Sequence, residues 1–134
     1  MTDRTNHSVD SLLAVQVIAA AEDAIITVNN HAQITSWNPG AERLFGYWAC
    51  DAIGQSLALI IPEAHRSAHM AGFHEALDRD HLEHGGQPAR VEGTTSSGKI
   101  IPLVMSLGLL QADGGVPVGV VAILRKGTNP ISFI

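Results

Sequence analysis

The short β-branched segments of this chain come in two groups, and their order limits the folds that it can adopt. Residues 24–28 and 33–37 form the first group, and residues 89–94, 100–110 and 116–124 form the second. Turn-forming asparagine or glycine residues separate neighbouring segments within each group, which predicts antiparallel hairpins. A helical pattern fills the interval between the groups, whereas a parallel sheet would need strands and helices to alternate. The order predicts an α+β fold with one antiparallel sheet.

Helical spacing of apolar side chains runs from Val9 to about Ala20, so we expect an N-terminal flanking helix. Asn38 and Pro39 are typical of the start of a second helix, because an asparagine caps free N–H groups and a proline at the first position has no N–H to leave unpaired. Gly46 indicates the end of this helix.

A longer helix is predicted after Pro62, to about Leu77. Its expected inner face consists of Ala68, Gly72, Phe73, Ala76 and Leu77. The polar segment 78–88, with two adjacent glycines, is interpreted as a surface loop.

The length of 134 residues allows one domain around a single core. We divide the chain into a flanking or dimerisation helix (1–21), a globular domain (22–126) and a C-terminal tail (127–134). Hydrophobic residues make up 46% and charged residues 16%, a balance that favours a folded domain over a disordered chain.

Composition and motifs exclude several classes of function. The net charge of −5 and the lack of a basic cluster argue against nucleic-acid binding. No apolar run approaches the roughly 20 residues that span a bilayer, and the polar N-terminus lacks a signal-peptide core, so we expect a cytoplasmic protein without membrane contact. The single cysteine, Cys50, excludes an internal disulfide. Neither a nucleophile motif nor a phosphate-binding glycine loop is present, so hydrolase chemistry is disfavoured and no catalytic residue is assigned.

Seven segments together resemble a PAS domain, over about residues 11–126. They are Asp23–Val28, Ile34–Pro39, Ala41–Tyr47, Ile53-Gly54, Leu59–Glu63, Ser97–Lys99 with Pro102, and Val118–Arg125. The resemblance implies a five-stranded antiparallel sheet with helices on one face. It also implies a sensory or dimerisation module of the kind found in two-component histidine kinases and transcription regulators, so we do not expect an enzyme. Such a module holds any ligand or cofactor in a small cavity between the sheet and the long helix.

The long-helix segment 62–74 resembles the haem-bearing helix of oxygen-sensing PAS domains. In that pattern His69 is the proximal haem ligand, and Phe73 is the aromatic residue four positions later. The resemblance thus makes haem b, bound to iron through His69, a candidate cofactor. One position departs from the pattern, because Ala89 stands where those sensors carry a ligand-binding arginine, with Arg90 on the opposite face of the strand.

Three residues of the expected sheet are candidates for lining the same cavity, namely Met105, Leu107 and Ile123. Met105 could supply a thioether as a sixth haem ligand. The helix motif of flavin-binding photosensors of this fold is absent.

Histidine pairs leave a metal site as a further alternative. His65 and His69 are one helical turn apart, and His81 and His84 follow in the loop; zinc or nickel could use such pairs. No carboxylate accompanies them at a known spacing.

Three functions stay open at this stage. The leading one is a sensory module that binds a small ligand or cofactor and regulates a partner output domain, linked to it or separate. The others are a haem-based gas or redox sensor using His69, and an interaction-only domain with an unoccupied cavity. The apolar stripe through Val9, Leu13 and Val17 would either cover the chain's own sheet or pair with a second copy, and we expect a homodimer.

Overall fold

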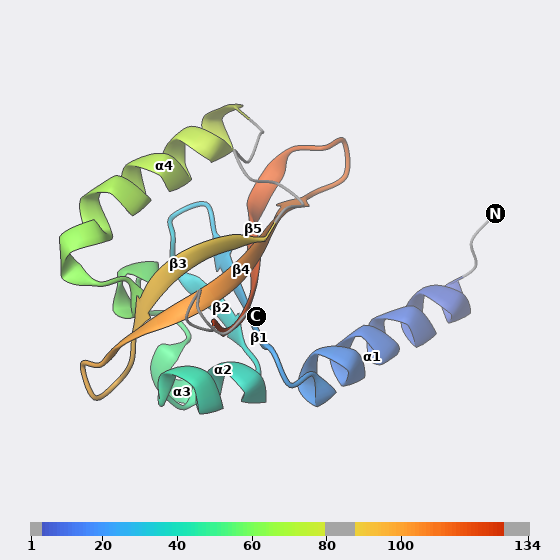
Figure 1. The fold of residues 1–134 in the computed structure, drawn as a ribbon. Coiled ribbons are helices and arrows are strands. Elements are labelled where there is room, and N and C mark those ends of the chain that lie inside the picture. The colour runs from blue at the N-terminus through green and yellow to red at the C-terminus, as the bar shows by residue number, and fades with distance from the viewer. Residues whose placement is uncertain (1–3, 80–87, 128–134) are drawn as a thin grey trace.

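The structure is a computed structural model that describes residues 4–79 and 88–127 (Figure 1). In chain order its elements are α1 (Arg4–Ala20), β1 (Ala24–Asn29), β2 (Ile34–Trp37), α2 (Pro39–Phe45), α3 (Ala49–Ala52), the 3-10 helices η1 (Leu57–Ile60) and η2 (Glu63–His65), α4 (Arg66–Arg79), β3 (Ala89–Thr94), β4 (Ile100–Gln111) and β5 (Pro117–Lys126). No helix within these residues combines the length and apolar character needed to cross a membrane.

The five strands form one antiparallel sheet in the order β2-β1-β5-β4-β3, which confirms the predicted fold class. Strands β1 and β5, from opposite ends of the chain, are hydrogen-bonded neighbours in its centre, with Ala24 paired to Leu124. Strand boundaries agree with the sequence prediction to within two residues. Helix α1 begins at Arg4 and not near Val9, because the segment between them contains no glycine or proline to stop it.

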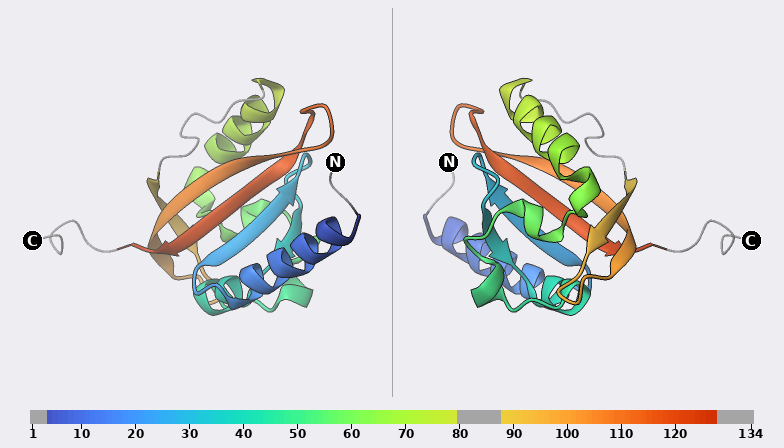
Figure 2. Two further views of the ribbon diagram at one scale, coloured as in Figure 1. Left: turned by 90° about the vertical axis from the view of Figure 1, so that its right-hand side faces the viewer. Right: turned by 90° about the vertical axis from the view of Figure 1, so that its left-hand side faces the viewer.

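The helical elements that follow β2 gather on one face of the sheet, as predicted (Figure 2). Helix α2 packs against β1, and its ends match the sequence signals. Asn38 caps its N-terminus, and Gly46 closes its C-terminus in the left-handed conformation, with φ 81°. Helices α4 and α1 lie on opposite sides of the molecule (Figure 1).

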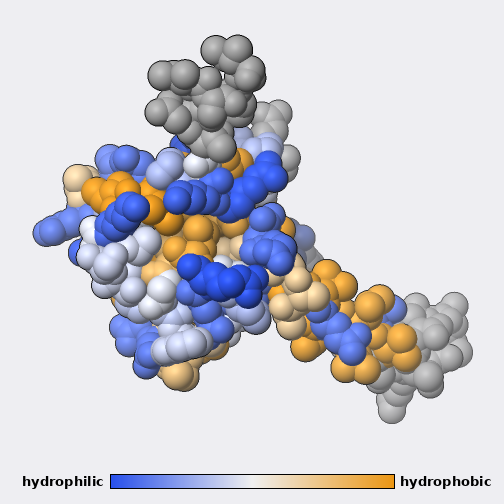
Figure 3. All heavy atoms as spheres, turned by 60° about the horizontal axis from the view of Figure 1, so that its bottom comes forward, coloured by the Kyte–Doolittle hydropathy of each residue, from blue (hydrophilic) through white to orange (hydrophobic). Residues whose placement is uncertain are grey.

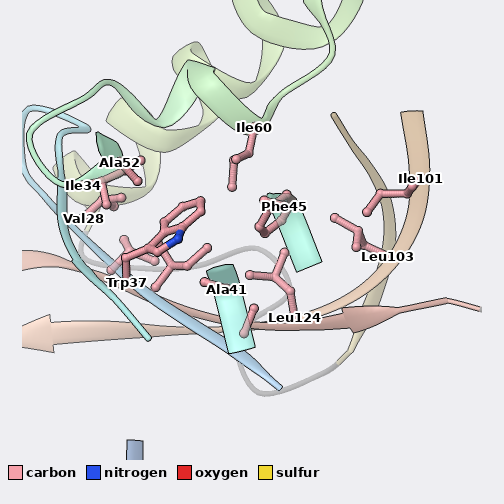
Figure 4. Packing of buried hydrophobic residues seen from close by; sticks show 13 residues of the cluster. Val28, Ile34, Trp37, Ala41, Phe45, Ala52, Ile60, Ile101, Leu103 and Leu124 are labelled. Atoms are coloured by element: carbon pink, nitrogen blue, oxygen red, sulfur yellow. The ribbon is translucent and has the colours of Figure 1, made fainter. Parts of the chain in front are cut away.

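The core lies between the sheet and the short helices. Phe45 of α2 is fully buried and its ring centroid lies 5.6 Å from that of Trp37. Figure 4 shows both rings and Ile60 in the space between the helical layer and the sheet. A Cβ at Gly93 would meet the Phe45 ring and the Leu103 side chain, so β3 can approach this layer only with glycine here.

The side chain of Asn38 connects four parts of the chain. Its Oδ1 atom accepts hydrogen bonds from the N–H groups of Ala41 (2.9 Å) and Ile25 (2.8 Å). Its Nδ2 atom donates to the carbonyl oxygens of Ile18 in α1 (2.9 Å) and Asp23 (3.0 Å). Asn38 is 4% exposed, so water does not compete for these bonds.

We expect Asn38→Ala to lower the free energy of unfolding by about 2–4 kcal/mol, since it removes a helix cap and leaves main-chain groups without partners. Urea unfolding measures the change. Asn30→Ala is the control, because Asn30 donates a single exposed hydrogen bond, to the carbonyl of Pro117, and its loss should cost under about 1 kcal/mol. Equal effects of the two substitutions would contradict the role of Asn38.

Candidate functional site

The inner face of β4 changes from buried to half-buried along the strand. Ile101 and Leu103 are 5% and 2% exposed and belong to the core. Met105, Leu107 and Leu109 continue the same face, but each is only half-buried. The hydrophobic core is therefore closed at one end of the strand and incompletely covered at the other.

Apolar side chains from neighbouring elements extend this half-buried region. We call the following residues the candidate ligand surface: Phe73 of α4, Met105, Leu107 and Leu109 of β4, and Ala122 of β5. None of these side chains carries a charge or a hydrogen-bond donor. The surface therefore suits an apolar ligand or the apolar part of a cofactor.

Helix α4 is anchored at its start. The Arg66 Nε atom donates to the carbonyl oxygen of Ile61 at 3.0 Å. Just before the helix, the His65 Nε2 atom lies 3.3 Å from Glu92 Oε1 on the edge strand β3. Both side chains of this second pair are more than half exposed, so it contributes little stability.

The side of α4 that faces the core differs from the prediction. Phe73 packs against the core as expected, but Ala68 and Gly72 are exposed and Met70 is half-buried instead. Met70 and Phe73 lie three positions apart, as neighbours on one face of a helix do. The side chains of Ala76 and Leu77 lie outside the described residues. Apart from Met70 and Phe73, residues 66–75 are exposed, so α4 is weakly held to the sheet.

His69 lies one turn before Phe73 on α4, with its side chain exposed. Surrounding protein atoms nevertheless remove part of its water, and this burial lowers the pKa of His69 below its ordinary value of 6.5. Repulsion by the nearby ring of His65, when charged, lowers the pKa further. His69 is therefore biased toward the neutral form, which leaves one ring nitrogen free to bind a metal.

Phe73, Met105 and Leu107 each pack against the hydrophobic core, whereas Ile123 lies on the other face of the sheet. Ile123 pairs with Ile25 and Ser106 and is 41% exposed on the outer face of the sheet. The prediction that it lines the cavity is therefore wrong. Ala89, which stands where oxygen-sensing PAS domains would carry an arginine, pairs with Met105 on the inner face of the sheet. Its neighbour Arg90 is exposed, so the two side chains alternate as the sequence predicts.

The alternative metal site finds no support in residues 4–79 and 88–127, where no group of three or more His, Cys, Asp or Glu residues could hold an ion. His81 and His84 lie outside the described residues. Cys50 is a free, exposed thiol on α3.

Sequence reasoning missed Leu109 and Ala122. The two-residue alternation from Leu103 through Met105 and Leu107 could have identified Leu109. Around Ala122 every residue from Val120 to Leu124 is apolar, so alternation gives no signal there.

Comparison with known proteins places this geometry in a family. Residues 13–127 match the family described as PAS fold. The chain belongs to the PAS family.

One curated relative is the Sensor protein FixL of Bradyrhizobium diazoefficiens, with 30% identity over 98 residues. The match covers 73% of this chain but 19% of the relative, so the chain spans about one fifth of that protein.

Solved PAS domains share the fold at low identity. The PAS domain of a protein from Colwellia psychrerythraea has a TM-score of 0.77 at 20% identity, covering 89% of this chain and 98% of the other. A PAS domain from a two-component sensor histidine kinase has a TM-score of 0.71 at 16% identity, covering 90% and 99%.

We expect the His69 ring to titrate below pH 6.5, measured by NMR of the imidazole resonances. The pKa of His69 is lower in the folded chain than in the unfolded chain, so the unfolded chain binds the proton more strongly. His69 therefore lowers the free energy of unfolding as the pH falls below 6.5. His65→Ala should raise the pKa of His69 only part of the way, because burial is the larger cause. His31→Ala, in the β1–β2 turn, is the control and should leave it unchanged. A His69 pKa at or above the ordinary value would contradict this account.

Proposed function

We propose that this PAS module senses a small apolar ligand or cofactor on the candidate ligand surface and regulates a partner output domain. It acts in the cytoplasm as a homodimer and without a catalytic step. The observation that carries the proposal is the half-buried inner face of β4 beneath a weakly held helix. Apolar side chains left half-covered there gain from burial when a ligand occupies the surface, at about 25 cal/mol per Å².

The mechanism is a shift between two arrangements of α4 and the sheet. A ligand that contacts both Phe73 and the β4 residues binds better to the arrangement that brings them closer. The ladder from β4 through β5 to β1 links this site to the start of β1, where Asn38 holds α1. A coupling of about 1–3 kcal/mol is typical of such regulation.

Indole, as an apolar aromatic probe, tests the candidate ligand surface. NMR titration should shift the methyl resonances of Met105 and Leu107 and leave that of Ile123, on the opposite face, in place. Leu107→Trp fills the surface and should weaken indole binding at least about tenfold. Val116→Trp, at an exposed position in the β4–β5 turn, is the matched control. Shifts that centre on Ile123, or equal binding by both variants, would overturn the proposed site.

Haem binding through His69 is the second candidate, supported by the resemblance of α4 to haem-bearing helices and by the position of His69 one turn before Phe73 of the candidate ligand surface. The lowered pKa of His69 favours the neutral ring, which has one nitrogen available to an iron. When bound, haem would supply gas or redox chemistry at its iron. Met105 then offers a thioether from the sheet, while Ala89 offers no hydrogen bond to a ligand on the iron.

Addition of haemin should produce a sharp Soret band in the absorption spectrum if His69 is a haem ligand. His69→Ala should remove or shift this band, because it removes the axial nitrogen. His31→Ala keeps all of the groups near α4 and should leave the spectrum unchanged. A Soret band that is the same in all three proteins would refute the role of His69. A flat spectrum together with no indole binding would instead favour an interaction-only domain.

A further inference from the structure

The chain has three methionines, and the two that follow Met1 lie where the core is incompletely covered. Met70 is on α4 and Met105 is on β4, and each of these side chains is half-buried. No methionine is found among the buried core residues that the structure describes. Helix α1, whose exposed apolar side chains are visible in Figure 3, contains none either. The two thioethers thus belong neither to the closed core nor to the exposed helix.

Met105 marks the point on β4 at which the core stops being closed. Two residues before it, Leu103 is 2% exposed, and two residues after it, Leu107 is half-buried. In the sheet register Met105 lies between Leu124 of β5, which is buried, and Ala89 of β3. Alanine has no side-chain atom beyond Cβ, so β3 covers little of the Met105 thioether. A change in the polarity of this side chain therefore acts on both the closed and the open part of the inner face.

Met70 belongs to the narrow half-buried side of α4. It shares this side with Phe73, three positions later, while the other residues from 66 to 75 are exposed. The flexible, unbranched thioether of methionine fills irregular apolar gaps well. Oxidation to the sulfoxide makes the same side chain polar and removes that advantage. Because α4 has so few half-buried side chains, a change in one of them alters how firmly the helix is held.

We propose that Met70 and Met105 are sites of reversible oxidation by hydrogen peroxide, and that their sulfoxides loosen α4 and lower the affinity of the candidate ligand surface. In the reaction a lone pair on sulfur attacks one peroxide oxygen, so a sulfur–oxygen bond forms and the oxygen–oxygen bond breaks. The proton on the transferred oxygen passes to the departing hydroxide, which leaves as water. Sulfur is oxidised by two electrons and the peroxide is reduced. A methionine sulfoxide reductase reverses the change with a pair of thiols, which become a disulfide while the oxygen leaves as water.

The sulfoxide oxygen is a strong hydrogen-bond acceptor and needs a donor when it is covered. The side chains of the candidate ligand surface have no donor to offer. An apolar ligand bound there would separate the oxygen from water without replacing its hydrogen bond, so oxidation opposes binding. This inference rests on the proposed function and adds a regulation of the same site.

Mass spectrometry of peptides from the peroxide-treated folded chain tests the modification itself. Met70 and Met105 should each gain one oxygen atom at a rate within about tenfold of that in the urea-unfolded chain, because solvent reaches both side chains. Cys50 is an exposed thiol that peroxide also oxidises, so the measurement is repeated with Cys50→Ala, which should give the same rates. Slower oxidation of either methionine than this limit would overturn the inference.

Binding of 1-methylindole before and after peroxide treatment tests the regulation. This probe lacks the N–H group with which indole donates a hydrogen bond to a sulfoxide. Its affinity should fall at least about tenfold on oxidation and return after treatment with methionine sulfoxide reductase. The double variant Met70→Leu with Met105→Leu keeps the size and apolar character of both side chains but has no sulfur there, so peroxide should leave its own starting affinity unchanged. Equal falls in the two proteins, or no fall in the unmodified chain, would overturn the inference.

Hydrogen exchange separates failure of this inference from failure of the proposed function. Oxidation should speed the exchange of the α4 amides at least about threefold in the unmodified chain, and not in the double variant, because the Met70 sulfoxide weakens the contact of α4. Unchanged exchange after oxidation would overturn the inference even in a chain that binds the probe. A chain that binds no probe before peroxide treatment would contradict the proposed function, while faster exchange of α4 in that chain would still support the oxidation switch.

Discussion

The buried carboxamide of Asn38 is the interaction on which the arrangement of this molecule depends. An asparagine offers both donors and an acceptor in one small planar group, and here both sides are used on main-chain atoms of α1, β1 and α2. Alanine, serine or aspartate cannot make the same set of bonds. One side chain that lies in neither element thus ties the end of α1 to the start of the sheet.

Most of the fold could be predicted because the residues that mark helix ends and turns agree with the order of the strands along the chain. Asn38, Pro39 and Gly46 mark α2 by capping and backbone preference, which need no tertiary information. The two groups of strands gave the antiparallel sheet. The second role of Asn38, its bond to the Ile18 carbonyl, could not be predicted, since it depends on how α1 meets the domain in three dimensions.

The candidate site was predicted less completely, for physical reasons that differ from residue to residue. Met105 and Leu107 follow the alternation of β4, so their side of the sheet could be inferred. Ile123 lies in a run where both faces are apolar, and only the pairing with Ser106 and Ile25 shows which way it points. For α4, the prediction included Phe73 but placed Ala68 and Gly72 on the inner face, where the structure has Met70 half-buried instead. Alanine and glycine occur on several faces of this helix, so the sequence pattern alone did not single out one inner face.

The pairing of Ala24 with Leu124 has a mechanical consequence. The chain enters the sheet through β1 and leaves it through β5 at the same end of one antiparallel ladder. A pulling force applied to the chain before β1 and after β5 would therefore break the β1–β5 hydrogen bonds one pair at a time. It would not load all of these bonds together in shear. Tension along a longer polypeptide would separate the central strands of this sheet before it could stretch the helical layer.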